Sequence, residues 1–113
     1  MKRNFSIPKG DKLLINEKGR RRYIEIEKIT HITCVGQLST IHILNNKPVS
    51  VYKSLKYFET EFKNYKFVRT NHNSLCNLCN VVEYKKINNK RILLLINGEK
   101  IEISKRKLSN IIK

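Results

Sequence analysis

The chain has 113 residues, 40% of them hydrophobic, which is enough for one domain with its own core and too little for two. Its 24 lysines and arginines against 9 acidic residues give a formal net charge of +15, which favours a polyanionic partner such as nucleic acid or an acidic membrane surface. No apolar run reaches the ~20 residues of a membrane-spanning helix and no signal peptide is recognisable, so we expect a cytoplasmic protein whose cysteines are reduced.

The first half of the chain predicts short antiparallel strands. Residues 1–10 are basic and hold a proline and a glycine, so we expect a flexible arm ahead of a domain at residues 11–113. Alternating or β-branched stretches predict five strands: Lys12–Asn16, Arg22–Ile26, Ile29–Val35, Leu38–Leu44 and Val49–Tyr52. Because Pro48 precedes the last strand, we expect that strand at a sheet edge. We interpret His31 and His42 as ordinary surface or half-buried strand residues.

The hydrophobic period becomes helical after Ser54, which is a suitable N-cap. Apolar residues then follow at helical spacing and predict one packed helix: Leu55, Phe58, Phe62 and Tyr65. Nearer the C-terminus we expect three strands and a short helix: Val81–Ile87, Arg91–Ile96, Lys100–Ser104 and the helix Lys105–Ile112. The aliphatic run from Ile92 to Ile96 indicates burial on both faces of its strand. Asn97-Gly98 predicts a type I′ hairpin turn, which needs positive φ at both central residues.

Polar side chains crowd the stretch Phe67–Asn77, between two apolar anchors. Its hydrogen-bonding members are Arg69, Asn71, His72, Asn73, Ser74 and Asn77. Side chains of these types read phosphates and base edges, so the stretch is predicted to be a presented loop. The alternative is a polar connector whose Asn and Ser side chains bond their own backbone.

His72, Cys76 and Cys79 are three potential zinc ligands within eight residues. A structural zinc site needs four ligands, and cysteines three apart along a strand point to opposite faces. We therefore interpret the cysteines as packing thiols and expect no metal. A nucleophilic Cys76 has no evident carboxylate to orient His72, and no glycine-rich phosphate loop is present, so we expect neither catalysis nor a cofactor.

The polar stretch and its surroundings resemble the LytTR family of bacterial DNA-binding domains. The family's central pattern is an aromatic residue, Arg, His, a polar residue, Ser, an apolar pair and Asn. This chain matches it with Phe67, Arg69, His72, Asn73, Ser74, Leu75, Cys76 and Asn77. The likeness covers roughly residues 12–112, because Ile26–Ile43 is similar to the family's opening strands, Ser54-Leu55 with Phe58 to its helix start, and Asn97–Arg106 to its final hairpin and basic tip.

The departures concern base preference rather than fold. Many members have Arg where this chain has Asn73, a common Glu-Ala is replaced by Thr33-Cys34, and Leu38 stands where an aromatic is frequent. Members are most often the output half of a response regulator. No receiver domain precedes the domain here, so we expect a free-standing member.

The resemblance implies a mainly β fold, and the strand spacing supports it: an elongated sandwich of small antiparallel sheets with one packed α-helix and a short C-terminal helix. It implies a transcriptional regulator that inserts loop side chains, rather than a recognition helix, into neighbouring major grooves of double-stranded DNA. Expected further partners are a second copy on repeated half-sites, and a membrane-bound inhibitor or a separate regulatory protein.

Carried onto this sequence, the family's contact loops predict a set of DNA contacts. We expect Asn73 and Arg106 to contact base edges, because Asn suits adenine and Arg suits guanine, with His72 as a third candidate. The DNA backbone is expected to contact Arg69, Leu38, Ser39, Thr40, Asn71, Ser74, Ser104, Lys105 and Lys107. For Arg69 and His72, bracing of the loop from within is the open alternative.

The alternative function is a basic module that binds RNA or an anionic surface without sequence readout. Single-strand binders expose stacking rings along a basic groove. The aromatic residues at core-like positions argue against it: Phe58, Phe62, Tyr65 and Phe67.

Overall fold

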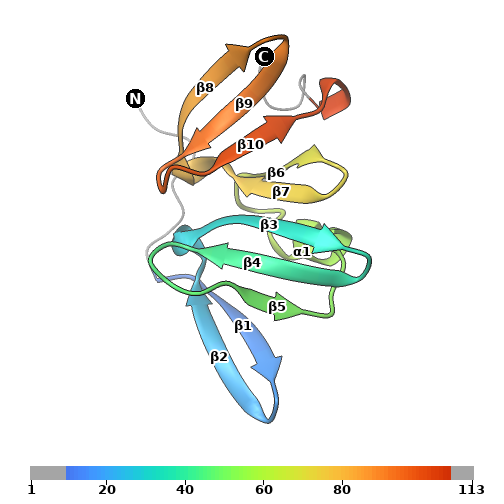
Figure 1. The fold of residues 1–113 in the computed structure, drawn as a ribbon. Coiled ribbons are helices and arrows are strands. Elements are labelled where there is room, and N and C mark those ends of the chain that lie inside the picture. Colours follow the sequence, from blue (N-terminus) through green and yellow to red (C-terminus); the bar gives the residue numbers. More distant parts are fainter. Residues whose placement is uncertain (1–9, 108–113) are drawn as a thin grey trace.

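The computed structural model describes residues 10–107, and these residues form a mainly β fold (Figure 1). The ten strands are β1 (Lys12–Glu17), β2 (Arg20–Glu25), β3 (Ile29–Val35), β4 (Leu38–Ile43), β5 (Val49–Val51), β6 (Phe67–Asn71), β7 (Ser74–Asn77), β8 (Val81–Ile87), β9 (Lys90–Leu95) and β10 (Lys100–Ile103). One α-helix, α1 (Leu55–Glu61), and three short 3-10 turns, η1 (Ile26–Lys28), η2 (Leu78–Asn80) and η3 (Lys105–Lys107), complete them.

The strands make three small antiparallel sheets, as the sequence predicted. Their orders are β1-β2, β5-β4-β3-β7-β6 and β10-β9-β8, and every pairing is antiparallel. Figure 1 shows the sheets one above another, with the β1-β2 hairpin at one end and the three-stranded sheet at the other. The molecule is elongated, with principal dimensions of 46 × 36 × 24 Å.

The five-stranded sheet carries apolar side chains on both faces because strand residues alternate in direction. Leu75 of β7 belongs to the larger core, which joins β1–β5 to the buried rings of Phe58 on α1 and of Phe62 directly after it. Its neighbour Cys76 belongs to the second core, with Leu93 and other residues of the three-stranded sheet. Strand β7 is therefore buried throughout and holds the two halves together.

Two buried asparagines fasten the link between β7 and β8. The Asn77 amide nitrogen donates to the carbonyl of Ile29 at 2.9 Å, and its oxygen accepts from the Cys79 amide at 3.1 Å. Asn80 donates to the same Ile29 carbonyl at 2.9 Å and to that of Glu27 at 3.1 Å. Asn77 is thus fully buried and satisfies backbone groups inside the molecule, rather than being presented as part of a loop.

The helix begins where the sequence predicted. Ser54 is extended, and its hydroxyl accepts a hydrogen bond from the Tyr57 amide at 3.1 Å, which caps the first turn. Strand β5 lies at the edge of its sheet, which agrees with the position of Pro48 just before it. At the C-terminal end, the predicted helix Lys105–Ile112 is described only as the 3-10 turn η3, and its remaining residues lie outside the described part of the chain.

The turn at Asn97-Gly98 is not type I′. Gly98 has φ +91° but Asn97 has no positive φ, and the Gly98 amide donates to the Leu95 carbonyl at 2.9 Å. The Leu95 amide in turn bonds the Glu99 carbonyl at 2.9 Å, which makes a three-residue loop with glycine in the left-handed region. Positive φ at two consecutive residues occurs instead in the β1–β2 turn, at Lys18-Gly19, and the β8–β9 turn, at Asn88-Asn89.

Two predictions about burial were wrong. The run Ile92–Ile96 is not buried on both faces: Leu93 and Leu95 are buried, but Ile96 is 57% exposed, because the three-stranded sheet packs on one side only. The expectation that His31 is a surface or half-buried residue was also wrong, whereas His42 is half-buried as expected. His31 is 3% exposed and stacks on His42 with ring centroids 4.1 Å apart and planes 3° from parallel.

Each stacked imidazole also contacts a threonine hydroxyl. Thr30 Oγ1 lies 3.0 Å from His31 Nδ1, and Thr33 Oγ1 lies 3.0 Å from His42 Nε2. Burial, together with repulsion from His42, lowers the pKa of His31 from 6.5 to about 4. Burial also lowers the pKa of His42, which Glu99 partly offsets. Both rings are therefore neutral at physiological pH.

Candidate nucleic-acid interface

Three tips of the fold lie on the same side of the molecule (Figure 1). They are the β3–β4 turn at Gly36-Gln37, the β6–β7 turn at His72-Asn73, and η3 with its three consecutive basic residues. These tips are far apart in the sequence. The antiparallel pairing of β3 with β7, and the position of β10 beside β6, bring them together.

The stretch Phe67–Asn77 is a hairpin rather than a long presented loop. Its residues form β6 and β7, and only His72 and Asn73 remain in the turn, where both are exposed. The Asn73 amide donates to Asn71 Oδ1 at 2.9 Å, so Asn71 bonds its own backbone as the connector alternative predicted. The hairpin thus presents two side chains on a firmly bonded base.

Hydrogen bonds join this hairpin to both neighbouring tips. The Cys34 amide at the end of β3 donates to the Asn73 carbonyl at 2.9 Å. On the other side, the Ser104 amide donates to the Thr70 carbonyl at 2.8 Å, and Asn71 Nδ2 donates to the Glu102 carbonyl at 3.0 Å. The three tips are therefore parts of one bonded surface.

A polar hollow of about 210 Å³ lies between two of these tips and the start of α1. Its lining includes two cationic side chains, Lys56 and Arg69, beside His72 and Asn73. The Arg69 guanidinium nitrogen Nη2 lies 3.4 Å from Glu59 Oε1, which forms a salt bridge. The Arg69 side chain is 24% exposed. Lys56 was not predicted as a site residue, because it reaches the hollow only through the packing of α1 beside the β6–β7 hairpin. In the sequence, its position two residues after the N-cap Ser54 could have indicated a cation at the helix start.

The predicted contact residues fall into three groups by exposure. The exposed ones are Leu38, His72, Asn73, Lys105 and Arg106, and the partly exposed ones are Thr40, Arg69, Asn71, Ser104 and Lys107. Ser39 and Ser74 are buried. The Ser39 hydroxyl donates to the Lys53 carbonyl at 2.5 Å, and that of Ser74 lies 2.8 Å from Thr70 Oγ1.

The zinc-like trio does not converge. Within residues 10–107, no three His, Cys, Asp or Glu side chains are arranged to hold a metal ion. Cys76 is completely buried, and burial raises the pKa of its thiol to about 12; burial also raises the pKa of Cys79. A metal ligand or a nucleophile must be a thiolate, and neither of these thiols is readily ionised.

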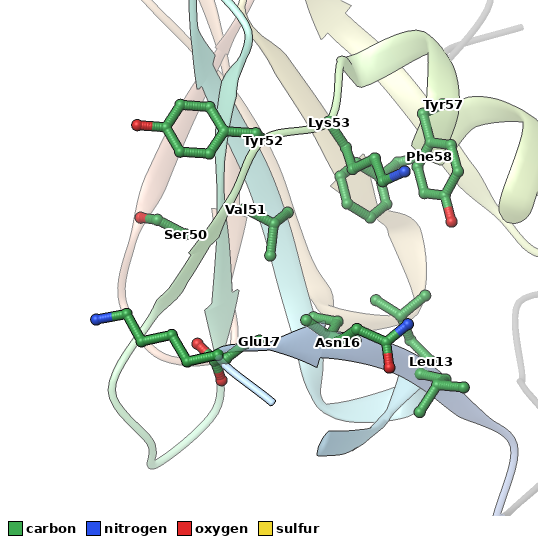
Figure 2. Close-up of a pocket in the computed structure, with 12 residues that line it drawn as sticks. Leu13, Asn16, Glu17, Ser50, Val51, Tyr52, Lys53, Tyr57 and Phe58 are labelled. Atoms are coloured by element: carbon green, nitrogen blue, oxygen red, sulfur yellow. The ribbon is translucent and has the colours of Figure 1, made fainter. Parts of the chain in front are cut away.

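A larger hollow of about 590 Å³ lies between β1, β5 and the start of α1 (Figure 2). It holds none of the predicted contact residues. Tyr52 is 83% exposed and Tyr57 is 37% exposed on its wall, and Lys53 Nζ lies 4.7 Å from the Tyr57 ring centroid. These rings were not among the aromatic residues weighed from the sequence.

No helix in the described part of the chain is long and apolar enough to cross a membrane.

The family model that matches the chain is the LytTr DNA-binding domain, over residues 19–113. A solved LytTr DNA-binding domain from Bacillus cereus has a similar fold, with a TM-score of 0.74 and 14% sequence identity; the match covers 88% of this chain and 91% of that one. No curated protein sequence matches.

Proposed function

The chain belongs to the LytTR family of DNA-binding domains, and from this premise we propose that it is a bacterial transcriptional regulator that reads duplex DNA by inserting its tips into the major groove. The observation that carries this proposal is the gathering of the three tips on one side, joined by hydrogen bonds. A recognition surface must hold its reading groups at fixed positions, and this bonded surface does so.

Base contacts are assigned to exposed side chains at the tips. Asn73 stands in the β6–β7 turn and suits adenine, while Arg106 stands at the centre of η3 and suits guanine. His72 is a further base candidate because it is exposed beside Asn73. The Asn73 backbone is held on both sides, because its amide donates to Asn71 Oδ1 and its carbonyl accepts from the Cys34 amide, so little order has to be gained at this turn on binding.

Phosphate contacts are assigned to the cations around them. Lys105 and Lys107 flank Arg106, and Lys56 and Arg69 line the polar hollow. A cation fixes the register of the protein on the DNA backbone without reading sequence. The buried hydroxyls of Ser39 and Ser74 are assigned a bracing role, because each is engaged within the protein; Leu38, Thr40 and Ser104 border the contact surface.

The proposed regulator acts on the bacterial chromosome, and hence in the cytoplasm. Two copies on repeated half-sites, and control by a membrane-bound inhibitor or separate regulatory protein, are part of the same proposal. Its function is binding rather than catalysis.

Substitutions at the tips test the proposal. The preferred site is first selected from random duplexes, and each variant is then titrated against that site and a scrambled duplex at two salt concentrations. Asn73→Ala and Arg106→Ala should each cost about 1 to 3 kcal/mol on the selected site and little on the scrambled duplex. Lys105→Ala is the matched control, and it should weaken both complexes alike.

A thermal melt of each variant distinguishes lost contacts from lost fold. If folded Asn73→Ala bound both duplexes as the parent does, or lost equal affinity for both, the β6–β7 turn would not be the reader. Equal affinity of the parent for every duplex would remove sequence-specific recognition altogether.

One observation favours a second candidate, which is binding of single-stranded nucleic acid. Tyr57 exposes its ring beside Lys53 on the larger hollow, and bases stack on such rings (Figure 2). Competition between a single-stranded oligonucleotide and the selected duplex separates the two. Preference for the single strand, lost in Tyr57→Ala, would favour this candidate over duplex recognition.

A further inference from the structure

Asn71 uses both ends of its side-chain amide within the protein. Its oxygen accepts from the Asn73 amide at 2.9 Å, inside the β6–β7 turn, and its nitrogen donates to the Glu102 carbonyl of β10 at 3.0 Å. Glu102 lies two residues before Ser104, where the chain passes into the basic turn η3. One side chain therefore bonds two segments that carry the proposed reading residues.

The surrounding bonds join the strands near the base of the hairpin, and Asn71 adds a connection that starts in the turn itself. The Ser104 amide bonds the Thr70 carbonyl, which sets β10 beside β6, and the Thr70 hydroxyl reaches Ser74 across the hairpin. Both contacts involve Thr70, which is completely buried in β6 and precedes the turn. Within the described residues, the side-chain bonds of Asn71 reach from the turn itself to β10.

We propose that Asn71 is a positioning residue that holds the β6–β7 turn and η3 at one separation, so that the protein reads two groups of bases at a fixed spacing. This inference rests on the proposed function, and it changes the role expected of Asn71 from the sequence. The Asn71 oxygen and one of its two N–H groups are engaged within the protein, so at most one N–H is left for a phosphate. Its effect on DNA binding passes through Asn73 and Arg106.

The test uses the selected duplex and a second duplex with one base pair inserted between the positions that depend on Asn73 and on Arg106. The parent should bind the inserted duplex roughly tenfold more weakly, because its tips cannot follow the added length. Asn71→Ala removes both bonds and should reduce that penalty to about threefold or less. Asn71→Ser keeps a hydroxyl that can cap the turn but cannot reach β10, and it should reduce the penalty in the same way.

Asn97→Ala is the matched control. Asn97 makes a similar bond in the β9–β10 loop, where its Oδ1 accepts from the Glu99 amide at 3.1 Å, and this loop lies at the opposite end of β10 from η3. The control should keep the parent's insertion penalty. A general loss of turn stability would therefore not imitate the expected result.

The outcomes are separable from those of the function itself. An unchanged insertion penalty in folded Asn71→Ala and Asn71→Ser overturns the positioning role. Equal weakening on both duplexes overturns it too, because that is the behaviour of a direct backbone contact. If both variants fail to fold, Asn71 supports the fold rather than the spacing, and the inference is also wrong. A parent without any sequence preference contradicts the proposed function instead.

Discussion

The stacked pair of His31 and His42 is the residue-scale feature with the clearest energetic consequence. His31 is buried, and its pKa is lowered from 6.5 to about 4. Between these two pH values the unfolded chain binds a proton at His31 and the folded protein does not. The neutral ring contributes stability that is fully present above pH 6.5. That contribution is lost progressively as the pH falls towards 4.

We therefore predict that the free energy of unfolding decreases by on the order of 3 kcal/mol between pH 6.5 and pH 4 through His31. Urea unfolding at a series of pH values measures this decrease. His31→Gln removes the titrating ring and should give a flatter curve over the same range. His72→Gln removes an exposed imidazole from the β6–β7 turn and should keep the parent's curve. Parallel curves for parent and His31→Gln would contradict the prediction.

At the scale of elements, the sequence located strands and turns better than it described their conformations. Hydrophobic alternation placed eight of the ten strands, whereas β6 and β7 were expected as a loop, and the residue type at Ser54 placed the helix start. The Asn97-Gly98 pair has the composition of a type I′ turn, yet an extra loop residue gives it a different conformation. Two asparagines at 88–89 form the turn with paired positive φ, because the registers of β8 and β9 leave only two residues between them.

The left-handed conformation of the β8–β9 turn can be tested by substitution. Asn89 has φ +67°, a region that asparagine and glycine tolerate better than alanine. We predict that Asn89→Ala lowers the free energy of unfolding by about 1 kcal/mol and that Asn89→Gly does not. Chemical denaturation measures both. Asn46→Ala, at an exposed position without positive φ, is the control and should change little; equal effects at both positions would contradict the prediction.

The candidate site was predicted only in part, because local sequence indicates residue types but not how distant segments pack. Residue types and the family pattern indicated Asn73 and Arg106, which the structure leaves exposed, although their contact with DNA stays a prediction. The burial of Ser39 depends on the Lys53 carbonyl, fourteen residues away, coming within hydrogen-bond distance. Lys56 joins the polar hollow through the packing of α1. Such relations arise from tertiary packing and are not encoded in local spacing.

The whole molecule carries a formal net charge of +15, and this charge predicts steep salt dependence. If Lys56, Arg69, Lys105 and Lys107 each neutralise one phosphate, a fourfold rise in salt should weaken duplex binding by about a hundredfold. Binding titrations between ~50 and ~200 mM salt measure the slope. Lys105→Ala should make that slope shallower by ~1. Lys90→Ala, at the start of β9, is the control that should leave the slope unchanged. A flat titration of the parent would contradict the assignment.

The elongated stack of sheets also sets an upper limit on the length of the proposed DNA site. A molecule 46 Å long covers about 13 base pairs of B-DNA, which rise ~3.4 Å each. That is more than one helical repeat of the duplex, so a single copy can face two successive openings of the same groove. The bases it reads should then fall in two short blocks on one face of the DNA, separated by positions where any base is accepted.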